Sequence, residues 1–259
     1  MSNALLRAFT SITLLVLAAA SLGACAGLPF TGSSGWKEEV LLHDGRTLVI
    51  ERSIVRRGRH EIGQSPPIGE QTIRFIMPDT HQTITWKDQY SEDLGMANFL
   101  PLALDIHHGV AYLIANPMGC LSYNKWGRPN PPHVVFKYNK NEWQRIPMEE
   151  LPAEIKMPNL ISSAPDVEVE KSGKRFMSAE MIKKIRMGYK QPDNRTILRE
   201  PTTGGNTGCM VMVRYRGHWI WDKDPIARKS IDIEIINKNR KNTPDQGKPD
   251  SQAPEKATP

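Results

Sequence analysis

The chain has 259 residues, of which 39% are hydrophobic and 24% are charged, and its formal net charge is +6. This composition agrees with a folded protein that contains one large domain or two small ones. Acidic residues are interspersed among the basic residues throughout the sequence, which argues against a nucleic-acid partner.

The first 24 residues have the three parts of an export signal. One cation, Arg7, precedes an apolar segment from about Ala8 to Ala20, and small residues follow. The apolar segment is shorter than the roughly 20 residues that cross a bilayer as a helix, and no second apolar stretch approaches that length. We therefore expect a mature protein without a transmembrane helix.

The signal ends in Leu22-Gly23-Ala24-Cys25, which resembles the lipobox of bacterial lipoproteins. The resemblance implies cleavage before Cys25 and attachment of lipid to its sulfur. Two or three acyl chains hold a protein on a bilayer firmly, whereas one chain holds it only marginally. In such lipoproteins an aspartate after the cysteine commonly causes retention in the inner membrane, and this chain has Ala26 instead. The resemblance therefore implies the outer membrane as destination, with the protein facing the periplasm.

Ordinary secretory cleavage after Ala26 is the alternative. Ala24-Cys25-Ala26 also fits the A-x-A pattern, and cleavage there would discard the cysteine and release a soluble periplasmic protein. We favour the lipoprotein because a thiol without a purpose is unusual in a signal peptide.

Four segments are predicted along the chain. Residues 1–24 form the signal peptide, and 25–35 carry the lipidated cysteine and a flexible tether of small residues. Residues 36–236 form a single β-rich periplasmic domain. Residues 237–259 contain no large apolar side chain, so they are predicted to be a disordered tail.

The first alternating run after the tether predicts a hairpin. Asp44-Gly45 can take the positive φ values of a tight two-residue turn. That register places Leu41 opposite Leu48 and Val40 opposite Val49.

The sequence continues with hairpins. The run 72–87 predicts two strands around Pro78-Asp79, and the inward face consists of Ile73, Phe75, Met77, Ile84 and Trp86. Runs 102–115 and 133–146 predict four more strands, which resemble a meander. Further strands are expected within 209–221 and 231–236.

One short helix is predicted over 178–187, with Ser178 as its N-cap. Long segments at 116–132, 147–177 and 188–208 are rich in Pro, Gly, Asn and Ser, so irregular loops are expected there. The predicted fold class is therefore mainly β, with antiparallel hairpins in a meander that is sandwich-like or partly propeller-like.

Cys120 and Cys209 are the two cysteines of the predicted domain. In an oxidising periplasm such a pair is a candidate disulfide. Two reduced, buried thiols are the alternative, because spacing alone does not show that the side chains meet.

No known catalytic motif occurs in the sequence, so no catalytic residue is predicted. Strand alternation puts Asp105 and His107 on one side and turns His108 away, which leaves two metal ligands where three or four are usual. We therefore predict no metal and no cofactor.

A binding surface has better support. Tyr123, Asn124, Trp126 and Arg128 stand in a predicted loop, and exposed aromatic rings with amide and guanidinium donors suit a sugar, a peptide or a protein. The alternative is that Tyr123 and Trp126 anchor the loop to the sheet.

These observations predict a noncatalytic binding or scaffolding lipoprotein of the cell envelope. Its partners would be the membrane, through acylated Cys25, and peptidoglycan or another envelope protein; nucleic acid is not expected. The alternative is an envelope hydrolase whose catalytic groups converge only in the fold.

Overall fold

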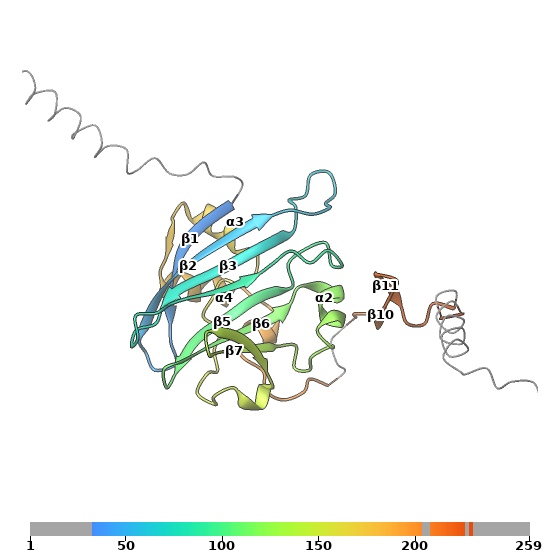
Figure 1. Ribbon diagram of the computed structural model, residues 1–259. Coiled ribbons are helices and arrows are strands. Elements are labelled where there is room, and N and C mark those ends of the chain that lie inside the picture. Colours follow the sequence, from blue (N-terminus) through green and yellow to red (C-terminus); the bar gives the residue numbers. More distant parts are fainter. Residues whose placement is uncertain (1–32, 204–207, 226–227, 230–259) are drawn as a thin grey trace, which may run out of the picture.

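Two β-sheets lie face to face in the computed structural model, which describes residues 33–203, 208–225 and 228–229 (Figure 1). Eight successive strands supply four strands to each sheet, and within a sheet each strand pairs antiparallel with the next. They are β1 (Ser33–Leu41), β2 (Thr47–Arg56), β3 (Ile68–Ile76), β4 (Thr83–Asp88), β5 (Phe99–His107), β6 (Val110–Pro117), β7 (Val134–Asn139) and β8 (Glu142–Ile146). The predicted mainly β meander is confirmed.

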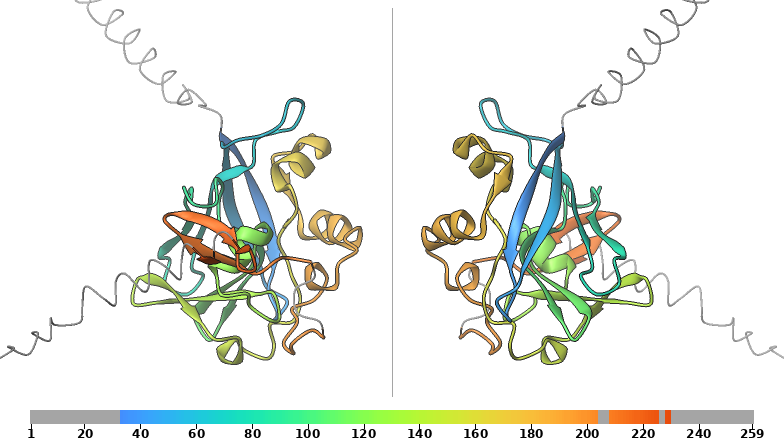
Figure 2. Two further views of the ribbon diagram at one scale, coloured as in Figure 1. Left: turned by 90° about the vertical axis from the view of Figure 1, so that its right-hand side faces the viewer. Right: turned by 90° about the vertical axis from the view of Figure 1, so that its left-hand side faces the viewer.

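The other elements surround the two sheets. They are α2 (Gly119–Lys125), η2 (Met148–Glu150), α3 (Pro165–Ser172), β9 (Phe176–Met177), α4 (Ala179–Met187), η3 (Pro192–Asn194), β10 (Met212–Tyr215) and β11 (His218–Trp221). β9 extends the first sheet by pairing in parallel with β1. Figure 2 shows α3 and α4 on one flank of β1 and β2, and the β10–β11 hairpin beside α2.

Of the helices, only α4 was predicted. Ser178 caps it as expected, because its Oγ accepts a hydrogen bond from Met181 N at 3.4 Å. The N-caps of α2 and α3 are Met118 and Ala164, and neither side chain makes a capping hydrogen bond. Neither helix therefore has the N-cap side chain that usually marks a helix start, although α3 begins with Pro165, and two segments predicted to be irregular each contain a short helix.

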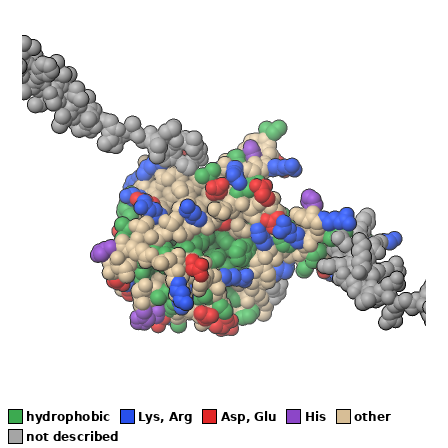
Figure 3. Space-filling view, in the orientation of Figure 1, with side chains coloured by type: hydrophobic (Ala, Val, Ile, Leu, Met, Phe, Trp, Pro, Cys, Tyr) green, Lys and Arg blue, Asp and Glu red, His purple; other side chains and the backbone are tan. Residues whose placement is uncertain are grey.

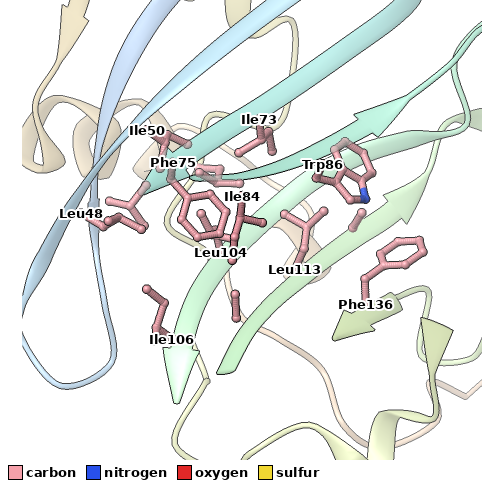
Figure 4. Close-up of a cluster of buried hydrophobic side chains, with 14 of the residues drawn as sticks. Leu48, Ile50, Ile73, Phe75, Ile84, Trp86, Leu104, Ile106, Leu113 and Phe136 are labelled. Atoms are coloured by element: carbon pink, nitrogen blue, oxygen red, sulfur yellow. The ribbon is translucent and has the colours of Figure 1, made fainter. Parts of the chain in front are cut away.

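The main core lies between the sheets. Every second side chain of β3 and β4 points into it, and the five residues predicted for this face are buried. They are Ile73, Phe75, Met77, Ile84 and Trp86. Leu104 of β5 and Leu113 of β6 meet them from the opposite sheet (Figure 4). Removing this apolar surface from water, at about 25 cal/mol per Å², is the main force that holds the sheets together.

The β1–β2 hairpin differs by one position from its predicted register. Val40, rather than the predicted Leu41, lies opposite Leu48, so the predicted pairs were wrong. The loop contains three residues, 43–45, instead of two, and the last of them, Gly45, has a φ of +85°. Three-residue hairpin loops place a glycine in this left-handed conformation. The extra loop residue accounts for the shift.

The strands expected within 102–115 and 133–146 form two hairpins. His107 pairs with Val110 and Asn139 pairs with Glu142, which leaves two residues in each turn. The central residues of both turns have φ between 48° and 72°. Two successive positive φ values are typical of the type I′ turn, whose twist matches that of antiparallel strands. The strands expected within 209–221 are present as β10 and β11, which pair antiparallel.

A buried ion pair lies on the inner face of β1 and β2. Arg52 Nη1 donates hydrogen bonds to Glu38 Oε1 and to Ile161 O, both at 2.8 Å. Trp36 Nε1 donates to the same Glu38 oxygen at 2.8 Å. The side chains of Arg52 and Glu38 are only 1% and 0% exposed. Such burial is tolerated because each charge has a partner of opposite sign and further hydrogen bonds.

The predicted pairing of Cys120 with Cys209 is confirmed. Their sulfur atoms lie 2.07 Å apart, which is disulfide-bond distance. The bond joins the first turn of α2 to the segment that precedes β10.

Several predictions concern residues outside the described part of the chain. These are the signal peptide 1–24, Cys25, the strand 231–236 and the tail 237–259. β1 begins at Ser33, so the last three residues of the predicted tether belong to a strand. Within the described ranges, no helix is both long enough and apolar enough to span a membrane.

Candidate functional site

An aromatic cleft of about 520 Å³ opens between β4, at the edge of the first sheet, and the second sheet. Six aromatic side chains line it: Trp86, Tyr90, Phe99, Trp126, Phe136 and Trp143. Figure 3 shows an apolar area at the centre of this face, with Lys and Arg side chains at its margin. We call these six residues and the space between them the aromatic cleft.

The rings of the aromatic cleft hold one another in place. Phe99 lies 4.5 Å from Trp126 and 5.2 Å from Phe136, measured between ring centroids. Trp86 lies 6.1 Å from Phe136 across the gap between the sheets (Figure 4). These tilted and edge-on arrangements are the favoured geometries for aromatic pairs. The aromatic surface is therefore preformed.

A buried carboxylate organises the polar side of the cleft. Asp88 accepts hydrogen bonds from Asn98 N at 2.9 Å, from Phe99 N at 2.8 Å and from Gln71 Nε2 at 3.1 Å. Burial raises the pKa of Asp88, and its hydrogen bonds oppose that rise. Asn98 Oδ1 in turn accepts a bond from Trp126 Nε1 at 3.2 Å. Asp88 thus fixes Asn98, and through it one indole ring.

Cationic side chains border the aromatic rings. Lys125 Nζ lies 2.8 Å from Asp93 Oδ1, which joins the last turn of α2 to the segment before β5. Burial alone would raise the pKa of Asp93, but hydrogen bonds from Lys125 and Ser91 lower it to about 2. On the other side, the guanidinium of Arg145 lies 5.6 Å from the ring centroid of Trp126. Such cation–π contacts contribute about 0.5–2 kcal/mol.

The four binding residues predicted from the sequence have different positions. Trp126 is half-buried and lines the aromatic cleft. Tyr123 is buried, and the guanidinium of Arg128 lies 4.9 Å from its ring centroid. Arg128 also donates to Cys209 O at 3.1 Å, while Asn124 Oδ1 accepts from Met212 N at 2.9 Å. These two side chains hold the segment beside the disulfide, away from the aromatic cleft.

Sequence reasoning did not find Trp86, Trp143 or Asp88 as site residues. Trp86 was predicted to be a core residue, which it is, but it also forms part of the cleft. Trp143 Nε1 donates to Thr85 O of β4 at 3.0 Å, and the two residues are 58 positions apart in the chain. Alternation along one strand gives no information on which edge strands approach one another.

A second cluster lies where the β1–β2 and β5–β6 turns meet. His43 Nδ1 is 2.7 Å from Asp105 Oδ1, and His43 N donates to Asp105 Oδ2 at 3.0 Å. His107 Nε2 lies 3.4 Å from Glu154 Oε2, and the His43 and His107 ring centroids are 5.3 Å apart. A backbone hydrogen bond lowers the pKa of Glu154, and the charges of nearby histidines lower it further. A cleft of about 500 Å³ lies beside this cluster.

This second cluster contains a pair, His43 and Asp105, that the sequence did not reveal. Asp105 and His107 were considered as metal ligands, but the contact of Asp105 with His43 spans 62 positions and carries no local signal. Among the residues that the structure describes, no three His, Cys, Asp or Glu side chains are grouped so as to hold a metal ion.

The aromatic cleft thus offers stacking surfaces bordered by amide, carboxylate and ammonium groups, and the histidine cluster offers a paired imidazole and carboxylate. The first arrangement is suited to binding, and the second can move a proton. Comparison of the chain with models of protein families, with curated proteins and with solved structures found no match.

Proposed function

We propose that the protein is a lipid-anchored lipoprotein of the outer membrane whose aromatic cleft binds a glycan of the cell envelope, with peptidoglycan as the ligand, and does so without catalysis. The convergence of six aromatic side chains on one preformed cleft carries this proposal. Clefts with mainly apolar walls and a few placed polar groups are the usual form of ligand sites.

A sugar ring matches this chemistry on two sides. Its C–H faces are apolar and can lie on the indole rings of Trp126 and Trp143, while its hydroxyls bind polar groups at the margin. Asn98 and Lys125 line the same cleft and supply an amide and an ammonium group. Because the rings already pack against one another, little side-chain entropy is lost on binding.

The sequence before the fold supports the location. Leu22-Gly23-Ala24-Cys25 resembles a lipobox, and β1 begins at Ser33. An extended chain spans at most about 3.5 Å per residue, so the eight steps from Cys25 to Ser33 reach about 28 Å. Such a tether would keep the domain close to the membrane and within the envelope.

Co-sedimentation with purified, protein-free peptidoglycan tests the binding proposal. Wild-type protein should sediment with the polymer, and Trp126→Ala should weaken binding about tenfold, the loss typical of a central aromatic contact. Lys87→Ala changes an exposed side chain of the cleft without disturbing the core, and a smaller loss is expected. Trp221→Ala is the matched control, because this exposed ring lies outside the cleft. Absence of wild-type binding would reject the proposal.

Hydrolysis is a second candidate function, favoured by the contact between His43 and Asp105. A carboxylate on Nδ1 orients an imidazole so that Nε2 can act as a general base toward a water molecule. This candidate predicts release of soluble fragments from peptidoglycan by wild-type protein and by His60→Ala, but not by His43→Ala. His60 is exposed and lies outside the cluster. If wild-type protein releases no fragments, this candidate is rejected and the binding proposal is unaffected.

A further inference from the structure

A basic groove of about 990 Å³ lies along the first sheet. It runs from β1, β2 and β3 to β9 and the start of α4, and shares no lining residue with the aromatic cleft. Its exposed cations are Lys37, Arg74, Lys174 and Arg175. Figure 3 shows Lys and Arg side chains over this part of the molecule. We call it the basic groove.

Positive charge exceeds negative charge in the basic groove. Among the described residues that line it, Glu51 is the only acidic one, and it lies 3.5 Å from Lys37 Nζ and 3.2 Å from Arg74 Nη1. Arg52 also lines the groove, but its charge is compensated by buried Glu38. Even without Arg175, three exposed cations, Lys37, Arg74 and Lys174, face one carboxylate among the described lining residues, so positive charge is in excess.

Two further features suit the basic groove to contact with lipid headgroups. Arg175 Nη1 donates to Gly35 O at 2.9 Å, which fixes a guanidinium beside the start of β1. Phe176, 46% exposed, stands next to it in sequence and lines the same groove. Aromatic rings among basic side chains are typical of protein surfaces at a membrane interface.

The basic groove lies close in sequence to Cys25, the proposed lipid anchor, and this position points to the membrane as its occupant. Its first lining residue, Gly35, is ten positions after Cys25, so an extended connection reaches at most about 35 Å. We propose that the basic groove docks on anionic phospholipid headgroups of the membrane in which Cys25 is anchored, an inference that rests on the lipid anchor of the proposed function. The anchor would raise the effective concentration of headgroups at the groove, so a weak site suffices.

Vesicle binding by protein without the acylated cysteine tests this docking independently of the lipid anchor. The mature chain from residue 26 onward contains every described residue, and it would be mixed with vesicles of phosphatidylcholine alone or with added phosphatidylglycerol. One basic residue near an anionic surface changes binding about fivefold. The phosphatidylglycerol vesicles should therefore bind the protein more than tenfold better, and added salt should weaken that binding.

Charge-reversal variants distinguish binding at the basic groove from an effect of the protein's net charge. Lys174→Glu should reduce binding to phosphatidylglycerol vesicles more than tenfold, because it changes two unit charges at the groove. Lys140→Glu, in the β7–β8 turn of the other sheet, makes the same change in net charge and should have a much smaller effect.

Three results would overturn the docking proposal. They are equal binding to both kinds of vesicle, equal losses in Lys174→Glu and Lys140→Glu, and binding of polyglutamate in place of vesicles, which would assign the groove to an acidic protein. Lys174→Glu should keep its binding to peptidoglycan. Failure of vesicle docking with intact peptidoglycan binding would therefore reject this inference and leave the function of the aromatic cleft standing.

Discussion

Trp143 on β8 donates a hydrogen bond from Nε1 to the carbonyl oxygen of Thr85 on β4, at 3.0 Å. The bond connects the edge strands of the two sheets, which do not pair with one another in a ladder. The ring of the same residue lines the aromatic cleft. One side chain thus contributes to both the closure of the fold and the candidate site.

Trp143→Phe should lower stability by about 1–2 kcal/mol, because it removes the donor to Thr85 and keeps most of the ring. Urea unfolding of the variant and wild type measures this difference. Trp221→Phe is the control, since Trp221 is 42% exposed on β11 and should tolerate the change within about 0.5 kcal/mol. An equal loss in both variants would show that the bond between the edge strands contributes nothing.

Alternation and turn residues predicted the hairpins of the second sheet, without fixing their loop lengths. Lys140 and Asn141 adopt the positive φ values of a two-residue turn, and the strands beside them pair as expected. At 43–45 the same reasoning chose two loop residues where the chain uses three, because Gly45 fits either loop. The alternation of buried and exposed side chains along each strand can be predicted without knowing the loop length, but the pairing of residues across the two strands cannot.

The candidate site was predictable only in part, because it is assembled from distant segments. Trp126 was identified from its local sequence, whereas Trp86 and Trp143 join it through the packing of two edge strands. His43 and Asp105 likewise meet through the approach of two hairpin turns. Local hydrophobic periodicity gives no information on contacts between distant segments, so composition and spacing could not reveal these contacts.

Loss of the disulfide should destabilise the protein. Cys120 and Cys209 are 89 positions apart, and a loop of that length contributes about 4–5 kcal/mol in the chain-entropy model. The double variant Cys120→Ser/Cys209→Ser should lose stability on this scale in urea unfolding. Alkylation of the denatured wild-type domain should label neither thiol before reduction and both after it. Labelling of both thiols without reduction would refute the bond.

Acid should weaken the fold through His133. Its Nδ1 lies 2.7 Å from Asn116 Oδ1, and its Nε2 accepts a hydrogen bond from Leu198 N at 3.0 Å. Burial lowers the pKa of His133 to about 4, whereas an unfolded histidine titrates at about 6.5. The ring is neutral in the fold, so its contribution is complete above about pH 6.5 and falls as pH drops toward about 4.

The expected loss from His133 is about 3 kcal/mol across that interval. Urea unfolding between about pH 7.5 and about pH 4.5 measures it. His133→Gln should be less stable at neutral pH but should lose less stability on acidification, because the variant has no such proton to bind. Identical pH dependence in both proteins would contradict this assignment.

Cys25→Ala should abolish the proposed membrane anchor. Acyl chains supply about 0.8 kcal/mol per buried methylene, and no described helix offers a replacement. The variant should lose incorporation of labelled palmitate, and it should either remain uncleaved or become soluble after cleavage at Ala26. Wild-type protein that takes up no palmitate and whose mature chain begins at Gly27 would establish the soluble secretory alternative.

The indole N–H resonances of the protein test the function of the aromatic cleft most directly. The chain has six tryptophans, and three of them, Trp86, Trp126 and Trp143, line the cleft. Titration with soluble peptidoglycan fragments, followed by ¹H–¹⁵N NMR, should shift the resonances of Trp126 and Trp143 first and leave Trp219 and Trp221 unchanged. Shifts confined to Trp219 and Trp221, or no shift at any ligand concentration, would contradict glycan binding in the aromatic cleft.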